Sequence, residues 1–231
     1  MIYAKPLALA AGLLLAGLAA PAQAVAIGGV EFPQGAVSFA DQVVSYDPAF
    51  GGSVTPSANH QGASNALGVP NYPGVNICAS QAACSFVSLG DGGRLVVRFT
   101  DNVLTGSNSS AFDLWIFEVG PDVEATFVDV SVDGFAWTSV GAVSGSTRGV
   151  DIDAFGFNTA SQLLFVRLTD NGVLGGQSGA TVGADIDAVG AISTRAVVTG
   201  VPEPATWLTL LAGFGLTGIA LRRRARLIVA A

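Results

Sequence analysis

The feature that most constrains this chain is an apolar run close to its C-terminus, because it marks a part of the sequence that does not contribute to a folded domain. The run covers residues 206–221 and contains no charged residue. As a helix rising about 1.5 Å per residue, it would span about 25 Å, close to the hydrocarbon core of a bilayer. The sequence therefore predicts one transmembrane helix over residues 205–221.

Proline, acidic and basic residues flank this run in a fixed order. Pro202, Glu203 and Pro204 lie before it, in a predicted linker over residues 197–204, and a basic tail over residues 222–231 follows it. The cationic residues of the tail are Arg222, Arg223, Arg224 and Arg226. Because arginines stay on the cytoplasmic side of a membrane, they predict a membrane stop that leaves the preceding chain outside the inner membrane.

The order of Pro-Glu-Pro, apolar run and arginine cluster over residues 201–226 resembles the PEP-CTERM sorting signal. The resemblance implies a protein of a Gram-negative bacterium that an exosortase-type membrane enzyme handles as a partner. It also implies that the C-terminal helix holds the protein in the inner membrane in transit, before delivery to the cell surface or the extracellular matrix. The alternative is an ordinary C-terminal membrane anchor.

The N-terminus carries a second apolar stretch. Lys5 precedes apolar residues 7–20, and the sequence Pro-Ala-Gln-Ala follows at residues 21–24. A short basic region, a short apolar region and an Ala-x-Ala sequence are typical of a secretory signal peptide, here residues 1–24. The alternative, an uncleaved N-terminal anchor, is disfavoured by Pro21 and the small residues after it. By length, residues 25–196 then form one domain.

The charge of this exported region differs from that of the whole chain. Setting aside Lys5, the four C-terminal arginines and Glu203 from the chain's 10 basic and 17 acidic residues leaves a net charge of about −11, against −7 for the full chain. Such an acidic surface repels phosphate backbones, which argues against a nucleic-acid partner. It fits an exported module and is compatible with the uptake of divalent cations.

The cysteine content agrees with export. Cys78 and Cys84 are the two cysteines of the chain, and they enclose five residues without a strand pattern. In an oxidising compartment they predict one small disulfide-closed loop. A free pair of thiols is the alternative, and a metal site is disfavoured because His60 is the single histidine.

Periodicity predicts an all-β domain. Alternating or continuous apolar stretches predict strands at residues 94–99, 112–118, 126–133, 135–140, 163–169 and 186–193. In the first of these, Arg94 and Arg98 are expected on the face opposite Leu95. Asp133-Gly134 predicts a tight hairpin turn. Short strands with frequent turns predict a two-sheet β-sandwich or jelly roll.

Five segments of this region are similar to those of galactose-binding-like jelly rolls, which occur in discoidin-type and carbohydrate-binding modules. They are residues 65–70, 87–93, 112–118, 130–134 with Trp137, and 183–189. The resemblance implies a non-catalytic module that binds glycans or other surface ligands through loops at one end, often with a structural calcium. Trp115 and Trp137 lie inside predicted strands, where we expect them in the core rather than on a sugar-stacking surface.

An acidic pattern occurs twice. Residues 149–156 read Gly-Val-Asp-Ile-Asp-Ala-Phe-Gly, and residues 183–190 read Gly-Ala-Asp-Ile-Asp-Ala-Val-Gly. In extended backbone the two aspartates of each copy point to one side, where their charges repel unless a cation lies between them. Because calcium prefers carboxylate oxygens, Asp185, Asp187 and Glu118 are the predicted ligands of a calcium ion. The alternative is that both pairs are solvated strand edges.

The lack of a catalytic motif in the sequence favours a protein that is not an enzyme. A histidine-dependent triad has only His60 as its base, and no Gly-x-Ser-x-Gly sequence occurs. We therefore expect an exported surface or matrix protein with a binding module whose partner is a surface polysaccharide. The alternatives are a structural matrix or exopolysaccharide-associated protein without a ligand site, and a glycan hydrolase that depends on Glu118 or Asp113.

Overall fold

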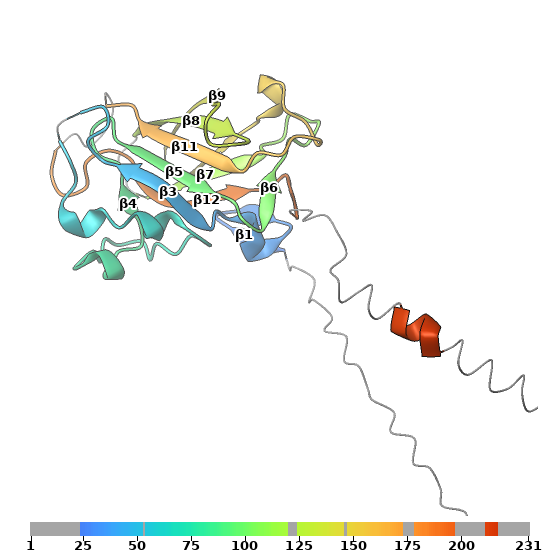
Figure 1. Ribbon diagram of the computed structural model, residues 1–231. Coiled ribbons are helices and arrows are strands. Elements are labelled where there is room, and N and C mark those ends of the chain that lie inside the picture. The colour runs from blue at the N-terminus through green and yellow to red at the C-terminus, as the bar shows by residue number, and fades with distance from the viewer. Residues whose placement is uncertain are drawn as a thin grey trace, which may run out of the picture. The chain divides into compact units, whose positions relative to one another are not determined.

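The computed structural model describes residues 24–52, 54–119, 124–145, 147–172, 178–196 and 211–216. The chain divides into two compact units, Met1–Ala196 and Val197–Ala231. The described part of the first unit consists mostly of antiparallel β-strands joined by loops and single turns of 3-10 helix, which confirms the β-rich prediction (Figure 1).

The larger sheet has five antiparallel strands in the order β3-β5-β11-β8-β9. These strands are Gln42–Asp47, Arg94–Arg98, Phe165–Asp170, Ala125–Ser131 and Thr138–Ser144. The central strand β11 pairs with β5 on one side and with β8 on the other, so that Arg167 lies opposite Val96 and Asp129. Figure 1 shows β3, β5 and β11 as neighbours in this sheet.

The second sheet has four antiparallel strands in the order β10-β7-β12-β4. They are Thr147–Val150, Leu114–Glu118, Asp185–Ala191 and Val87–Ser88. Two smaller pairs complete the strands of the described residues, β1 with β2 and β6 with β13. Their bounds are Val25–Ile27, Val30–Phe32, Asn102–Leu104 and Thr194–Ala196.

One apolar core lies between the two larger sheets, which gives the domain a sandwich-like arrangement. Alternate residues of β5, β7, β8 and β11 enter this core, as do Val87 of β4 and residues of β12 on both sides of a β-bulge. Among the fully buried members are Leu95, Val97, Leu114, Ile116, Val166, Leu168, Ile186 and Val189. Because side chains alternate along a strand, the neighbours of these residues face outward from the sheets.

An aromatic cluster covers the face of the four-stranded sheet that points away from the apolar core. Phe32 at the end of β2 and Phe39 pack against Phe117 of β7, with ring centroids 4.7–6.0 Å apart. Ala188 of β12 completes the buried part of this cluster. Both faces of β7 are therefore covered, which agrees with the apolar character of residues 112–118.

The predicted hairpin turn at Asp133-Gly134 is wrong in length. Strand β8 ends at Ser131 and β9 begins at Thr138, so a six-residue connection joins them. The carboxylate of Asp133 accepts hydrogen bonds from the backbone amides of Phe135 and Ala136 at 2.8 and 2.9 Å. These bonds form a local loop that competes with strand pairing. Val132, which belongs to the predicted strand 126–133, is 56% exposed as a consequence.

The disulfide prediction is confirmed, because Cys78 and Cys84 are bonded. Cys84 is buried with Phe86 and Val119, and Tyr72 packs against them. Ser80 holds the loop by accepting a hydrogen bond from the amide of Ala83. The disulfide thus fixes a segment that has little regular structure of its own.

Most of the predicted terminal segments lie outside the described residues. These are the signal peptide over 1–24 except Ala24, the linker over 197–204 and the basic tail over 222–231. Within the predicted membrane segment 205–221, residues 211–216 are helical and the others are outside the described part. In the part of the chain that the structure describes, no helix has both the length and the apolar character needed to cross a membrane.

The packing of Gly190 gives the first testable prediction. A β-carbon added there would lie 2.7 Å from the ring of Phe32 and 2.8 Å from that of Phe39, both fully buried. We expect Gly190→Ala to lower the free energy of unfolding by about 1–3 kcal/mol, as overpacking does. Urea unfolding followed by circular dichroism measures this.

Gly62 provides the matched control. A β-carbon at Gly62 would lie 2.9 Å from Nδ2 of Asn65, the mobile end of a half-buried side chain. Gly62→Ala should therefore cost less stability than Gly190→Ala. Equal losses in the two variants would contradict the buried packing of Phe32 and Phe39.

Candidate ligand-binding groove and acidic clusters

Arginines gather on the outer face of the five-stranded sheet. Of the five arginines in residues 25–196, Arg94 and Arg98 lie on β5 and Arg167 lies on β11. Each precedes or follows a core residue, so strand alternation directs its side chain away from the core, as predicted for β5. This face therefore carries positive charge on a domain that is acidic overall.

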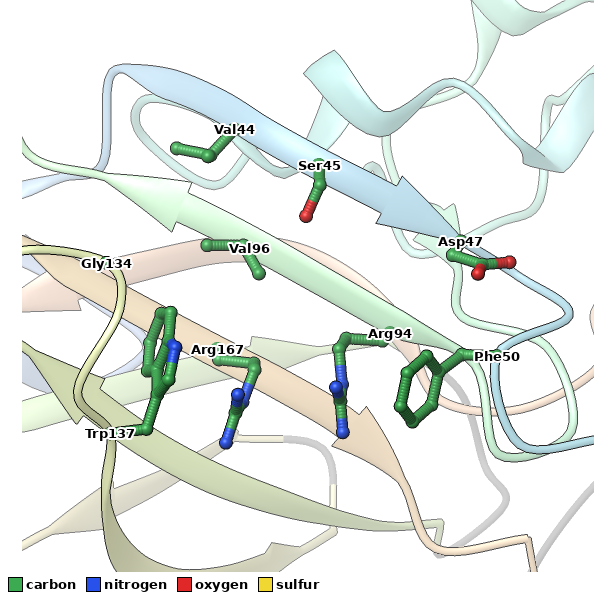
Figure 2. Close-up of a pocket in the computed structure, with 9 residues that line it drawn as sticks. All are labelled: Val44, Ser45, Asp47, Phe50, Arg94, Val96, Gly134, Trp137 and Arg167. Atoms are coloured by element: carbon green, nitrogen blue, oxygen red, sulfur yellow. The ribbon is translucent and has the colours of Figure 1, made fainter.

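Two of these arginines line a groove of about 390 Å³, which we call the arginine groove (Figure 2). Its lining residues are Val44, Ser45, Asp47, Phe50, Arg94, Val96, Gly134, Trp137 and Arg167. The guanidinium of Arg94 lies 3.4 Å from the ring centroid of Phe50, and that of Arg167 lies 4.4 Å from Trp137. Figure 2 shows both guanidinium groups between the two aromatic rings and pointing to the same side.

A bond from the Nε atom of each arginine holds its side chain in place. Arg167 Nε forms an ion pair with Asp129 Oδ2 at 3.0 Å, and Arg94 Nε donates to Thr169 Oγ1 at 3.1 Å. Burial, followed by the positive charge of Arg167, lowers the pKa of Arg94 from its ordinary value. An arginine remains charged even so, because its ordinary pKa lies far above neutral pH. The groove therefore presents two cations whose ring-stacked positions are set before a ligand arrives.

The expected core position of Trp137 is wrong. It belongs to the connection before β9 rather than to a strand, and its half-buried ring forms one side of the arginine groove. Trp115 differs, because it lies in β7, packs against the aromatic cluster of Phe32 and meets Phe112 edge-on at 5.5 Å. Sequence periodicity misplaced Trp137 because the predicted second strand of the hairpin began at residue 135, inside the loop before β9.

A buried acidic group surrounds Glu118 at the end of β7. Its members, which we call the Glu118 cluster, are Glu118, Glu124, Asp170 and Asp185, all less than 10% exposed. Burial is the largest cause that raises the pKa of Glu118 to about 9, followed by the charge of Glu124 and that of Asp185. Glu118 therefore keeps its proton at neutral pH and shares a hydrogen bond with Glu124.

The other two members have protein partners of their own. Asp170 accepts hydrogen bonds from the backbone amides of Gly92, Gly172 and Ala184 at 2.8–3.0 Å. Asp185 accepts a short hydrogen bond from the hydroxyl of Ser88. These bonds compensate the two charges for the loss of water, whereas Glu118 Oε1 is buried and has no hydrogen-bond partner among the described residues.

Asp187 is separated from the two other residues predicted with it. A β-bulge interrupts the pairing of β12 with β7 between Ile186 and Ala188, opposite Glu118. The carboxylate of Asp187 accepts backbone hydrogen bonds from Asn71 and Tyr72, each at 3.1 Å. The structure thus brings Glu118 and Asp185 together and gives Asp187 different partners.

The first copy of the acidic pattern is not extended, contrary to the expectation for both copies. Ile152 is in the right-handed helical region, and Asp153–Phe155 form a 3-10 turn, η5. The carboxylates of Asp151 and Asp153 nevertheless lie with that of Asp113, within 4.8 Å of one another. We call these three residues the Asp113 cluster.

His60 is a buried structural residue. Its Nδ1 lies 2.8 Å from Ser57 Oγ, its Nε2 lies 3.1 Å from Asn76 Nδ2, and its ring packs on Phe86. Cys78 and Cys84 are close enough to form a metal-binding geometry with it, but both are oxidised to the disulfide. A disulfide sulfur is not the thiolate that metal ions require, so this group is not a metal centre.

Comparison with known protein families identifies the C-terminal signal. The PEP-CTERM protein-sorting motif matches residues 200–224. Comparison with curated proteins and with solved structures found no match. The matched motif indicates an exported bacterial protein that an exosortase sorts to the cell surface.

The pKa of Glu118 predicts how stability depends on pH. Between its ordinary value of 4.5 and its folded value of about 9, Glu118 is protonated in the folded state and ionised in the unfolded state. The free energy of unfolding should therefore fall as pH rises through this window, by about 1.4 kcal/mol per pH unit. Urea titrations at several pH values, with a chelator present, measure this slope.

Glu118→Gln should flatten this dependence, because glutamine keeps the shape but does not titrate. Glu31→Gln, at an exposed glutamate of β2, is the control and should retain the wild-type slope. The same slope in Glu118→Gln and the wild type would show that Glu118 is not the buried group that titrates.

Proposed function

We propose that this protein is an exported surface or matrix component whose β-domain binds a carboxylate-bearing polysaccharide in the arginine groove without cleaving it. The observation that carries this proposal is the row of Phe50, Arg94, Arg167 and Trp137 on one sheet face. The two rings stack on the guanidinium groups and hold them in place, and guanidinium groups pair with carboxylates through their N–H edges. An acidic polysaccharide presents such carboxylates at intervals along its chain.

The distribution of charge supports this class of ligand. The groove contains cations on a domain whose net charge is strongly negative, so a polyanion is repelled from most of the surface and attracted to this face. Asp129 orients Arg167 through their ion pair, and Asp129 together with Asp47, which lines the groove, limits the net positive charge. A flexible chain of sugars matches an open groove better than a small enclosed ligand would.

We also propose that the protein does not cleave this polysaccharide, and the burial of the two candidate acids supports this. Glu118 is the carboxyl group whose pKa would suit a general acid, but it is 7% exposed and lies in the second sheet rather than in the groove. Asp113, the other candidate acid, is fully buried. Neither residue contributes to the lining of the arginine groove.

Sorting completes the proposed function. The chain enters the inner membrane of a Gram-negative bacterium through its C-terminal apolar segment, and an exosortase-type enzyme recognises the motif matched at residues 200–224. Pro202 and Pro204 disfavour helix and sheet pairing around Glu203, which favours recognition of this segment by that enzyme. The β-domain then reaches the surface or matrix, where its polysaccharide is abundant.

Binding to polygalacturonate tests the groove. We expect the purified full chain in mild detergent to bind this polyanion saturably and more weakly as salt increases. Trp137→Ala and Arg94→Gln should each weaken binding about tenfold, the equivalent of about 1.4 kcal/mol. Microscale thermophoresis with labelled polygalacturonate measures the dissociation constants.

Each variant has a matched control outside the groove. Phe112→Ala removes an aromatic ring that is 49% exposed and precedes β7 of the other sheet, and Arg148→Gln removes an arginine of β10 in that sheet. Both should bind as the wild type does. Equal binding by all four variants, or equal binding of neutral dextran, would refute the groove, and absence of saturable binding would favour the structural matrix role. Turnover of the polysaccharide would instead indicate a hydrolase.

The sorting motif makes a separate prediction. Replacing Pro202, Glu203 and Pro204 by alanines should leave the protein in the inner membrane with its C-terminal segment intact, because the processing enzyme loses its recognition segment. Cell fractionation followed by mass spectrometry of the C-terminus measures this. Normal surface delivery of the variant would contradict the sorting role of these residues.

A further inference from the structure

We infer that the Asp113 cluster is a calcium site that joins two loops at one end of the four-stranded sheet. It differs from the predicted grouping of Glu118, Asp185 and Asp187, and it does not depend on the arginine groove. Asp113 precedes β7, Asp151 follows β10, and Asp153 begins η5. Strands β10 and β7 pair so that Val150 lies opposite Leu114, which makes Asp151 and Asp113 the next residues beyond this pair.

The spacing of the carboxylates suits one ion. A ligand oxygen from each aspartate lies within 4.8 Å of the other two. Two oxygens bound to the same Ca²⁺ lie at most about 5 Å apart, since each Ca²⁺–oxygen distance is about 2.3–2.6 Å. The three side chains therefore already converge to the separation that a shared cation requires.

Two carboxylate oxygens of the cluster are buried and have no hydrogen-bond partner among the described residues. They are Asp113 Oδ1 and Asp153 Oδ1. The side chain of Asp113 is fully buried, so water does not compensate its charge. A buried carboxylate oxygen without a partner is costly, and a bound cation would remove that cost.

The other oxygens are held by the protein, which sets the direction of the free ones. Asp113 Oδ2 accepts from the amide of Ile152 at 3.0 Å, and Asp151 Oδ1 accepts from the amide of Asp153 at 3.0 Å. Asp153 Oδ2 accepts from both the amide and the hydroxyl of Ser107, at 2.8 and 3.0 Å. Such bonds to the second oxygen orient metal-binding carboxylates toward their ion.

The charge balance also favours a cation. Among the described residues, none of the three aspartates forms an ion pair with an arginine. Repulsion among three neighbouring carboxylates is relieved by a divalent ion with hard-oxygen preference. The irregular loops around the cluster suit Ca²⁺ better than the strict octahedron of Mg²⁺.

The ion would connect segments that strand pairing leaves apart. Ser107 lies in the loop between β6 and β7, and it reaches the cluster through Asp153. The same two segments are joined by the hydrogen bond from Gly106 N to Asn158 O at 3.0 Å. Calcium at this point would therefore stabilise the end of the sandwich at which β10 ends and β7 begins.

Calorimetry of the purified full chain in detergent, stripped with EDTA and dialysed, tests the inference. Titration with CaCl₂ should show one ion per chain, with a Kd of about 10⁻⁴ to 10⁻³ M, the range of extracellular calcium modules. Asp151→Asn and Asp153→Asn should each raise this Kd at least tenfold and abolish the calcium-dependent rise in melting temperature. Asp151 is half-buried, so its variant is expected to fold.

Glu118→Gln is the control, because it changes the other acidic cluster. It should bind calcium as the wild type does. No heat of binding to the wild-type chain at millimolar CaCl₂ would overturn the inference. So would unchanged affinity in both aspartate variants, or loss of binding in Glu118→Gln alone, which would place the ion in the Glu118 cluster.

Discussion

The alternation of side chains along β5 and β11 is the constraint on which the rest of the structure depends. It sends Leu95 and Leu168 into the core shared by the two sheets and sends Arg94 and Arg167 to the opposite face. Burial of the apolar side chains fixes the strand register. The same register sets the spacing of the two arginines, so the stability of the core and the geometry of the groove have one origin.

The acidic residues of the domain are used in three different ways. In the Glu118 cluster, protonation and backbone hydrogen bonds remove the repulsion, as the raised pKa of Glu118 indicates. In the arginine groove, Asp129 orients Arg167. In the Asp113 cluster, two buried carboxylate oxygens have neither a hydrogen-bond donor nor an arginine as partner among the described residues, which is why calcium is proposed there. A net charge alone does not distinguish these roles; local partners do.

Sequence patterns predicted the features that depend on local periodicity. The outward direction of Arg94 follows from strand alternation, and the disulfide follows from two cysteines in an exported segment. Patterns failed where a tertiary partner decides the conformation. The Asp-Ile-Asp of the first copy follows an edge strand and turns into η5, whereas that of the second copy is extended because it lies in β12 between two neighbours. Trp137 was misplaced because the hydrogen bonds of Asp133 lengthen the loop before it.

The central claim is that an anionic sugar chain lies between the two stacked arginines. The most direct measurement is nuclear magnetic resonance of the ¹⁵N-labelled protein during titration with an oligogalacturonate. The account predicts that the Nε signals of Arg94 and Arg167 and the indole signal of Trp137 shift together, while those of Arg148, Arg195 and Trp115 stay in place. Shifts confined to residues outside the groove, or no shifts at saturating ligand, would contradict it.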